Sequence, residues 1–438
     1  MKQNSSIQND IHNSLKNHIL ADGMPISLDL EKSNGCYIHD RKSGKDYLDL
    51  FTCFASMPIG FNHPKINNSK FINKIGKVAL NKPSNSDLYT EEFASFVEAF
   101  FDKAVPSQFK YGFFISGGAL AVENALKAAF DWKVRKNLQL GIKDKDQKVI
   151  YFNEAFHGRS GYTMTITNTS PDKVMYFPKF DWIKVDNPKI KFPVHLNLED
   201  LVIREKNTIA QIKKAFIDNP DEIAAIILEP IQGEGGDNHF RPDFLQKLKS
   251  LAIENNSLLI FDEVQTGLGI TGSWWAHEQL GVQPDILAFG KKMQTCGIIA
   301  GSRLDEVEDN VFHKSSRINS TWGGNLVDMV RAEAYINIIE EEKMLSNVLE
   351  RGDDILIGMH KVAEKHSDIV TNIRGRGLFS AFDINPKHRN KFLENTFSNG
   401  LIILPCGHNS IRFRPPLNVT KDEINLGIDI IEKSISQL

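Results

Sequence analysis

Short apolar runs recur along the first two thirds of the chain, and each is followed by polar residues or glycine. They lie at residues 111–115, 148–152, 224–228, 258–261 and 285–289. Runs without alternating polar positions are typical of strands buried on both faces, as in the parallel sheets of α/β proteins. The sequence therefore predicts an open α/β sheet in this part of the chain.

Two of these runs lead to residues that carry acid–base chemistry. Asp262 follows the run 258–261, and Lys291 follows the run 285–289 after one glycine. Open α/β sheets bind ligands in the crevice at the carboxyl ends of their strands, so we expect this carboxylate and this amine to face one crevice. Pyridoxal phosphate needs such a pair. The amine makes an imine with its aldehyde, and the acid keeps its pyridine nitrogen protonated so that the ring accepts electrons.

The segment Gly267–Gly272, GLGITG, matches the G-x-G-x-x-G pattern of dinucleotide-binding sites. A Rossmann site requires the first glycine to follow its strand closely and a helix to begin within the motif. Here five residues separate the apolar run from Gly267, and Trp274, Trp275 and His277 follow the motif. A dinucleotide-binding protein is therefore kept only as a minor alternative.

The composition argues against several classes of partner. The chain has 438 residues, of which 41% are hydrophobic and 24% charged, and its formal net charge is −3. This length suits about two domains, and the balanced charge argues against nucleic acid or an anionic membrane as a partner. No apolar run approaches the roughly 20 residues of a membrane span, and the polar first ten residues are unlike a signal peptide. We therefore expect a cytoplasmic protein.

The cysteines indicate neither a metal site nor a disulfide framework. Cys36, Cys53, Cys296 and Cys406 are far apart, with no CxxC pair and no histidine at zinc-ligand spacing. Such a pattern is typical of reduced, structural thiols. We expect no bound metal.

The stretch Leu258–Lys292 resembles the signature of the class III aminotransferases, which carry F-D-E-V-Q-T-G after one strand and Gly-Lys after the next. Further family motifs follow in order along nearly the whole chain. The resemblance implies the fold type I architecture, an α/β fold. Its large domain has a mostly parallel central sheet flanked by helices, and its smaller α+β domain is made from the two chain ends. It also implies pyridoxal 5'-phosphate as the cofactor.

The resemblance assigns roles around the cofactor residue by residue. It implies that Asp262 pairs with the pyridinium, that Lys291 forms the Schiff base and that Gln265 bonds the phenolic oxygen of the ring. The same alignment with the family motif implies that the neighbouring Lys292 does not contact the cofactor. The residues alone had already indicated the acid and the amine.

Three domain segments are expected. Residues 1–58 form an N-terminal arm and a hairpin that join the small domain, residues 59–327 form the large cofactor-binding domain, and residues 328–438 form the C-terminal small domain. Alternating apolar and polar residues predict the two strands of the hairpin within residues 36–51, around a turn at residues 42–45.

Three local predictions complete this outline. Strands are expected at residues 401–404 and 410–413, close to the end of the chain. In the segment 174–207 the apolar residues keep no regular spacing, so this segment is predicted to be a loop.

Helical spacing places Gly117 and Gly118 just before a helix amino terminus, where free N–H groups and the helix dipole favour an anion. Without further context a plain turn is the commoner meaning of two glycines before a helix. In the family this turn, with the next residue, holds the cofactor phosphate. Ala119 stands where the family commonly has a hydroxyl residue, so backbone donors must hold more of the phosphate. Phe156 matches the aromatic residue that stacks on the pyridine ring.

Substrate contacts are expected from Arg159, Glu234, Arg412 and Gln265. The arginine of F-H-G-R-S-G-Y binds a substrate α-carboxylate in lysine 6-aminotransferases, and a guanidinium suits this by its bidentate fork. This role passes to Arg159. Glu234, in a glycine-rich loop, matches a gate that pairs with an arginine of the C-terminal domain. In the family that arginine is the first residue of the motif R-F-x-P-P, which corresponds to Arg412 here. The alternation of side chains along a strand cannot distinguish Arg412 from Arg414, because it places both on the same face.

Thr321 precedes two glycines and a long apolar-periodic helix. It matches the family threonine that reaches the phosphate bound to the other subunit. The resemblance therefore implies a homodimer with shared active sites.

The motifs GALAVEN from Gly118 and QTCGIIAG from Gln294 resemble the lysine 6-aminotransferase branch. The implied reaction moves the ε-amine of L-lysine to 2-oxoglutarate and gives 2-aminoadipate 6-semialdehyde and L-glutamate. Ornithine, acetylornithine and 4-aminobutyrate aminotransferases share most of these motifs, so the length of the donor stays open.

Overall fold

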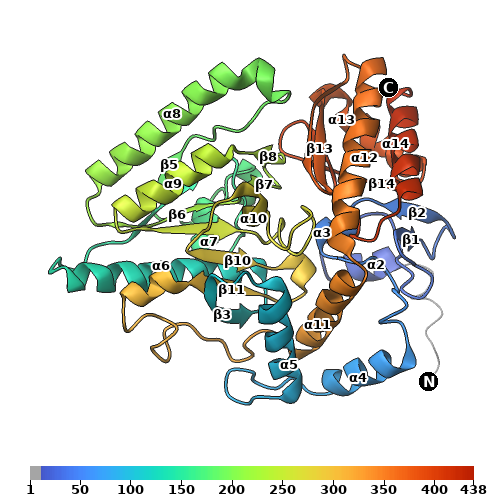
Figure 1. Ribbon diagram of the computed structural model, residues 1–438. Helices are drawn as coiled ribbons and strands as arrows, with labels where there is room; N and C mark the ends of the chain where they lie inside the picture. The colour runs from blue at the N-terminus through green and yellow to red at the C-terminus, as the bar shows by residue number, and fades with distance from the viewer. Residues whose placement is uncertain (1–10) are drawn as a thin grey trace.

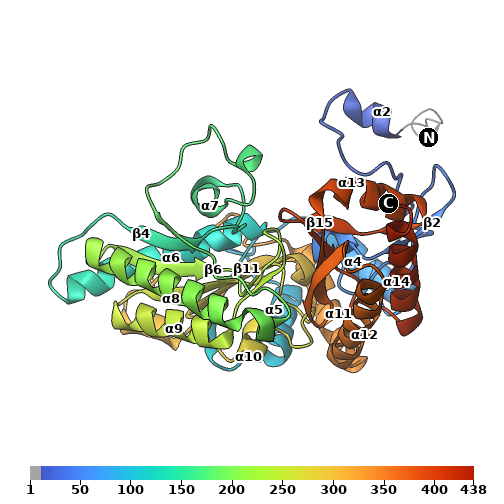
Figure 2. The ribbon, with the colours of Figure 1, turned by 90° about the horizontal axis from the view of Figure 1, so that it is seen from above.

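The computed structural model describes residues 11–438, and Figure 1 shows them in two parts side by side. The larger part, on the left of Figure 1, is built on a seven-stranded sheet. The smaller part, on the right, joins blue segments from the start of the chain to orange and red segments from its end. The view from above keeps the same separation (Figure 2).

The large sheet contains the strands that the apolar runs predicted. Its strands are β3 (Phe109–Ile115), β4 (Lys148–Phe152), β5 (Ile183–Val185), β6 (Ile223–Leu228), β9 (Leu258–Asp262), β10 (Ile286–Phe289) and β11 (Cys296–Gly301). They lie in the order β3-β11-β10-β9-β6-β4-β5, and β11 alone runs in the direction opposite to the other six strands. Every residue of β6, β9 and β10 is buried, which explains why they are apolar apart from Asp262 at the end of β9.

Helices cover both faces of this sheet. α6 (Gly118–Gln139) buries Trp132 against one face, whereas α8 (Val194–Asp218) and α9 (Pro242–Glu254) bury Phe216 and Phe244 against the other. Figure 2 shows α8 and α9 running side by side. The larger part also contains α5 (Glu91–Ala99), α7 (Gly161–Ile166), α10 (Ala276–Leu280) and the short hairpin of β7 (Ile231–Gln232) and β8 (Asn238–His239).

The smaller part contains two sheets. One has the order β1-β2-β14 and the other β12-β13-β16-β15, with bounds β1 (Tyr37–His39), β2 (Asp46–Asp49), β12 (Val370–Arg376), β13 (Phe379–Ile384), β14 (Leu401–Ile402), β15 (Leu404–Cys406) and β16 (Ser410–Phe413). β14 pairs in parallel with β2, so both chain ends share a sheet. The remaining helices are α2 (Ile11–Lys16), α3 (Thr52–Ala55), α4 (Ser69–Ala79), α11 (Leu326–Glu341), α12 (Met344–Lys365), α13 (Pro386–Ser398) and α14 (Lys421–Ile435).

The predicted hairpin is present. β1 and β2 pair antiparallel with Ile38 opposite Tyr47, and the Asp40 carboxylate accepts from the backbone N–H of Ser43 at 3.1 Å to hold the turn. Of the predicted arm, residues 1–10 lie outside the described part of the chain. The three domain boundaries stay predictions.

Two local predictions are wrong in part. The segment 174–207 contains β5, and α8 begins within it at Val194. Because α8 leaves Leu196 and Ile203 exposed, its apolar residues do not keep to one face, and the helical period is weak. The strand predicted at 401–404 is interrupted, because the chain leaves one sheet after Ile402 and enters the other at Leu404.

Within residues 11–438, no helix combines the length and the apolar character needed to cross a membrane. The same residues contain no group of three or more histidine, cysteine or acidic side chains that could hold a metal ion. All four cysteines are free thiols.

Candidate active site

Five strands of the large sheet bring the residues that follow them to one rim. The glycine turn before α6 follows β3, Phe156 follows β4, Glu229 follows β6, Asp262 ends β9, and Lys291 follows β10. Since β4, β6, β9 and β10 are parallel neighbours, their carboxyl ends meet at one edge. There they line a cavity of about 290 Å³ together with Gly118, Ala119, His157, Gly158, Glu234, Val264 and Gln265.

The two adjacent lysines lie in different surroundings. Lys291 lines the cavity, and burial lowers the pKa of its amine although the nearby Asp262 charge acts in the opposite direction. Lys292 is buried elsewhere, and its Nζ donates to the carbonyl oxygen of Ala55 at 2.9 Å. Lys291 also has a left-handed backbone with φ 48°, a strained conformation for a residue with a Cβ. Of the two amines, Lys291 is the one that reaches the cavity.

A buried histidine holds Asp262 in place. His157 Nδ1 and Asp262 Oδ2 are 2.7 Å apart, and the Val264 N–H donates to Asp262 Oδ1 at 3.1 Å. Both side chains of the pair are almost fully buried, and a buried carboxylate favours cationic or N–H partners. A protonated pyridine nitrogen fits that requirement.

A second buried carboxylate lies close to this pair. Glu229 accepts from the N–H of Phe156 at 2.9 Å and from the N–H of Gly233 at 3.0 Å. Burial raises the pKa of Glu229 to about 7, although His157 and the two N–H groups act to lower it. Glu229 thereby ties the loop after β4 to the loop after β6, which form two walls of the cavity.

The amino terminus of α6 borders the same cavity. Gly117 has φ 110°, no side chain caps the helix, and Gly118 and Ala119 line the cavity. Uncapped N–H groups and the positive end of the helix dipole make an anion site. A Cβ on Gly158 would lie 2.4 Å from the Ala119 Cβ, so the loop after β4 packs tightly against this turn. The phosphate of pyridoxal 5'-phosphate fits the turn through backbone donors.

Gln265 is oriented by a buried arginine. Its Oε1 accepts from Arg414 Nε at 3.1 Å and from Arg414 Nη2 at 2.9 Å, which leaves its amide nitrogen as the remaining donor. Arg414 Nη2 also donates to Asp237 Oδ1 at 2.6 Å, and the guanidinium lies 3.5 Å from the centre of the Phe379 ring. Arg414 is thus fully partnered by protein groups.

Glu234 bridges two cations. Its Oε1 lies 2.6 Å from Lys173 Nζ, and its Oε2 lies 2.8 Å from Arg412 Nη2. Burial by itself raises the pKa of Glu234, but Arg412 and Lys173 together lower it below its ordinary value. The Arg412 side chain is 3% exposed, and its Nη1 has no hydrogen-bond partner among residues 11–438. The guanidinium therefore keeps one donor for a further anion.

Arg159 and Thr321 do not line this cavity in a single chain. Arg159 follows the lining residue Gly158, is exposed, and pairs with no carboxylate among residues 11–438. Thr321 is exposed beside Trp322, whose ring lies 3.8 Å from Lys82 Nζ. Both side chains are accessible to a ligand or to a second chain.

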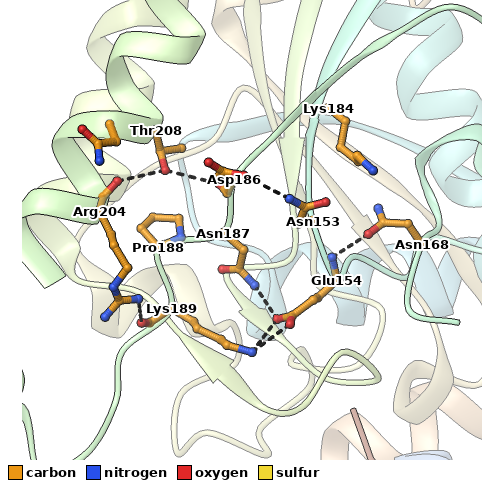
Figure 3. A pocket seen from close by; sticks show the side chains of 11 residues that line it. Asn153, Glu154, Asn168, Lys184, Asp186, Asn187, Pro188, Lys189, Arg204 and Thr208 are labelled. Atoms are coloured by element: carbon orange, nitrogen blue, oxygen red, sulfur yellow. Dashed lines mark hydrogen bonds and ion pairs between the residues drawn. The ribbon is translucent and has the colours of Figure 1, made fainter. Parts of the chain in front are cut away.

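A second cavity, of about 530 Å³, lies at the carboxyl ends of β4 and β5 (Figure 3). In it, the Glu154 carboxylate accepts from Lys189 Nζ at 2.8 Å and from Asn238 Nδ2 at 2.9 Å. Asn238 also donates to the carbonyl oxygen of Gly235 at 3.2 Å, and a Cβ on Gly235 would lie 2.0 Å from the Glu154 carbonyl oxygen. This polar network fixes the glycine loop that carries Glu234.

Four contributors to the site had no role in the sequence analysis: His157, Glu229, Lys173 and Arg414. Glu229 was recognisable in principle, because it follows a buried strand as Asp262 ends one. His157 likewise stands beside Phe156 at a strand end. Lys173 has no such signal, since its partner is 61 residues away in sequence.

Known proteins are similar to this chain in sequence and in fold. The family model described as aminotransferase class-III matches residues 19–435. The L-lysine-epsilon aminotransferase of Amycolatopsis lactamdurans is 45% identical over 433 residues, which cover 98% of this chain and 96% of the relative. The 4-aminobutyrate aminotransferase of Schizosaccharomyces pombe is 31% identical, with 93% and 89% covered.

Among solved structures, the lysine aminotransferase from Mycobacterium tuberculosis in the internal aldimine form is similar to this chain with a TM-score of 0.96 and 44% identity. The match covers 98% of this chain and 99% of that one. The cavity residues also fit the cofactor of that family, with an amine, a buried carboxylate and an uncapped helix terminus around one space. The chain therefore belongs to the class III aminotransferases, enzymes of fold type I that use pyridoxal 5'-phosphate.

Proposed function

We propose that the protein transfers the ε-amine of L-lysine to 2-oxoglutarate, giving 2-aminoadipate 6-semialdehyde and L-glutamate. The higher identity to an L-lysine-epsilon aminotransferase, 45% against 31% for a 4-aminobutyrate aminotransferase, supports this donor. The observation that carries the proposal is the pairing of Arg412 with Glu234, which lines the cavity, together with Arg159, which follows the lining residue Gly158 and has no carboxylate partner among residues 11–438.

These charges match the two unlike substrates. L-lysine presents its ε-amine to the cofactor, so its single carboxylate lies far from the reacting carbon and binds Arg159. A bare Arg412 beside that carbon would then be a buried, unpaired charge, which costs several kcal/mol. Glu234 removes this cost by pairing with Arg412. 2-Oxoglutarate has a carboxylate next to its keto carbon, and this group takes Arg412 when Glu234 moves aside.

The other residues act on protons and on orientation. When bound, pyridoxal 5'-phosphate supplies an aldehyde and a ring that accepts electrons. Asp262, fixed by His157, would hold the proton on the ring nitrogen, and Gln265 would donate to the phenolic oxygen. The lowered pKa of Lys291 favours its neutral amine, which would move a proton between the substrate carbon and the C4′ atom. Phe156 would cover the ring, and Gly117, Gly118 and Ala119 would hold the phosphate.

We also infer a cytoplasmic homodimer with shared sites. The four free thiols suit a reducing compartment. The Ser84 hydroxyl donates to the carbonyl oxygen of Thr321, and in these two adjoining segments Trp322, Leu88 and Tyr89 are 48%, 66% and 79% exposed. Such a surface suits burial against a second copy, and it would deliver Thr321 to the phosphate of the partner's site.

Single-turnover kinetics test the proposed roles. We expect Arg412→Ala to slow the 2-oxoglutarate half-reaction by about two orders of magnitude, as for a lost buried charge contact, and to spare much of the lysine half-reaction. Arg159→Ala should damage both halves. Glu234→Ala should impair mainly the lysine half and improve reaction with the α-amine of glutamate-like donors.

The donor is tested in the same assay with lysine, ornithine, N-acetylornithine and 4-aminobutyrate. A preference for one of the last three would place the protein in a neighbouring branch of the family. If the Arg412 and Glu234 variants slowed both half-reactions equally, the proposed role of Glu234 as a gate would be contradicted.

A further inference from the structure

Lys173 contacts the gate carboxylate directly, although the proposed function gives it no task. It ends the short turn Pro171–Lys173, and its Nζ lies 2.6 Å from Glu234 Oε1 and 3.3 Å from Thr169 Oγ1. The ammonium also lies 5.3 Å from the centre of the Phe156 ring. Glu234 therefore has a separate cation on each carboxylate oxygen.

The two cations come from opposite parts of the molecule. Arg412 belongs to β16 of the smaller part, whereas Lys173 follows α7 in the larger part. Glu234 stands between them on a glycine-rich loop, and its side chain is 27% exposed. Motion of this one side chain can therefore change which cation it neutralises, while both cations stay in place.

Opening the gate requires Glu234 to leave Arg412. A largely buried carboxylate that loses its only partner is destabilised by desolvation, which would keep the gate closed. With Lys173 present, one oxygen stays paired throughout, so this cost is largely avoided. Sharing the carboxylate between two cations also weakens its hold on Arg412 before any ligand arrives.

We propose that Lys173 is a positioning residue for the gate, which keeps Glu234 paired while Arg412 receives the carboxylate of 2-oxoglutarate. This inference rests on the proposed function and deepens it. Lys173 acts through Glu234 and leaves the substrate contacts to Arg412 and Arg159. Without Lys173, Glu234 stays on Arg412, and the dicarboxylate has to compete with it for the guanidinium.

The test uses protein loaded with pyridoxamine 5'-phosphate, so that the 2-oxoglutarate half-reaction is measured without any amino donor. We expect Lys173→Met to raise the 2-oxoglutarate concentration for half-maximal rate about tenfold, equivalent to ~1.4 kcal/mol. The lysine half-reaction of the pyridoxal form should change by less than about twofold, because Arg412 remains paired there. Calorimetry with glutarate, an unreactive dicarboxylate, should show the same weakening as an equilibrium property.

Two variants serve as controls. Lys173→Arg keeps a cation within reach of Glu234 and should restore 2-oxoglutarate binding close to that of the unchanged protein. Lys179→Met removes an exposed lysine from the same segment and should have no effect on either half-reaction.

A double-mutant cycle decides whether Lys173 works through the gate. In a Glu234→Gln background, Lys173→Met should add no further loss. An equal loss with and without the gate carboxylate would show that Lys173 binds substrate or supports the fold, and would overturn the inference. The inference would also be overturned if Lys173→Met impaired the lysine and the 2-oxoglutarate half-reactions equally. If L-lysine fails as a donor, the proposed function is wrong, but the pyridoxamine form still tests Lys173.

Discussion

Neighbouring lysines in this protein differ in reactivity because their amines have different surroundings. Lys291 lines the cavity with a lowered pKa, whereas Lys292 donates to the Ala55 carbonyl oxygen away from it. We expect borohydride reduction of the holoenzyme to attach the cofactor to Lys291, as located by fragment masses of the labelled peptide. The Lys291→Ala variant should take up no covalent label. A label on Lys292 would show that the register is wrong by one residue.

Glu229 should make the stability of the protein depend on pH. Burial raises its pKa from 4.5 to about 7 in the folded protein, so folding favours its protonated form. The resulting stability is complete below about pH 4.5 and is lost as the pH rises through 7. A shift of this size corresponds to about 3 kcal/mol.

Urea unfolding of the cofactor-free protein between pH 5 and 8 measures this effect. Glu229→Gln stays neutral at every pH, so its free energy of unfolding should fall less steeply with pH than that of the unchanged protein. The free energy of unfolding of the variant is lowered by the same amount at every pH, because its NH₂ group cannot accept a hydrogen bond from the N–H that faces it. Parallel curves for the two proteins would contradict the raised pKa.

At the scale of elements, the buried strands were the most predictable feature. A strand covered on both faces is apolar throughout, so β4, β6, β9 and β10 are visible as runs, and the residues after them fall at one rim. α8 was missed because several of its apolar residues face solvent. A helix with apolar residues on its exposed face lacks the regular spacing of apolar positions by which helices are recognised in a sequence.

The choice between Arg412 and Arg414 shows a different limit. Alternation places both side chains on one face of the strand, and the resemblance alone selected Arg412. In the structure Arg414 pairs with Asp237, whereas Arg412 pairs with Glu234 and its Nη1 has no hydrogen-bond partner in the described part of the chain. Both partners come from a loop that is remote in sequence, so local pattern carries no information about the pairing.

At the scale of the whole molecule, the proposed dimer predicts that active sites are shared. Because Thr321 is exposed and absent from the lining of its own cavity, Thr321→Ala should weaken cofactor retention while leaving the imine lysine in place. Retention is measured by dialysis followed by absorbance of the bound cofactor. Thr321→Ser keeps the hydroxyl and is the matched control that should retain the cofactor.

Mixed dimers test the sharing directly. When Thr321→Ala chains are combined with Lys291→Ala chains, one site of each heterodimer receives both intact groups if Thr321 acts across the interface. Activity should then recover relative to either parent. Verified heterodimers without recovery would show that Thr321 serves its own chain.

The pairing of β2 with β14 determines when the molecule can finish folding. Leu48 lies opposite Leu401, so the amino-terminal hairpin waits for a strand that is synthesised near the end of the chain. Until then Leu48 and Leu50, which are buried in the finished protein, remain open to water and to other chains. The strands of the large sheet lie closer in sequence and can assemble earlier. We therefore expect the smaller part to close last, after the strand near the carboxyl end of the chain has been made.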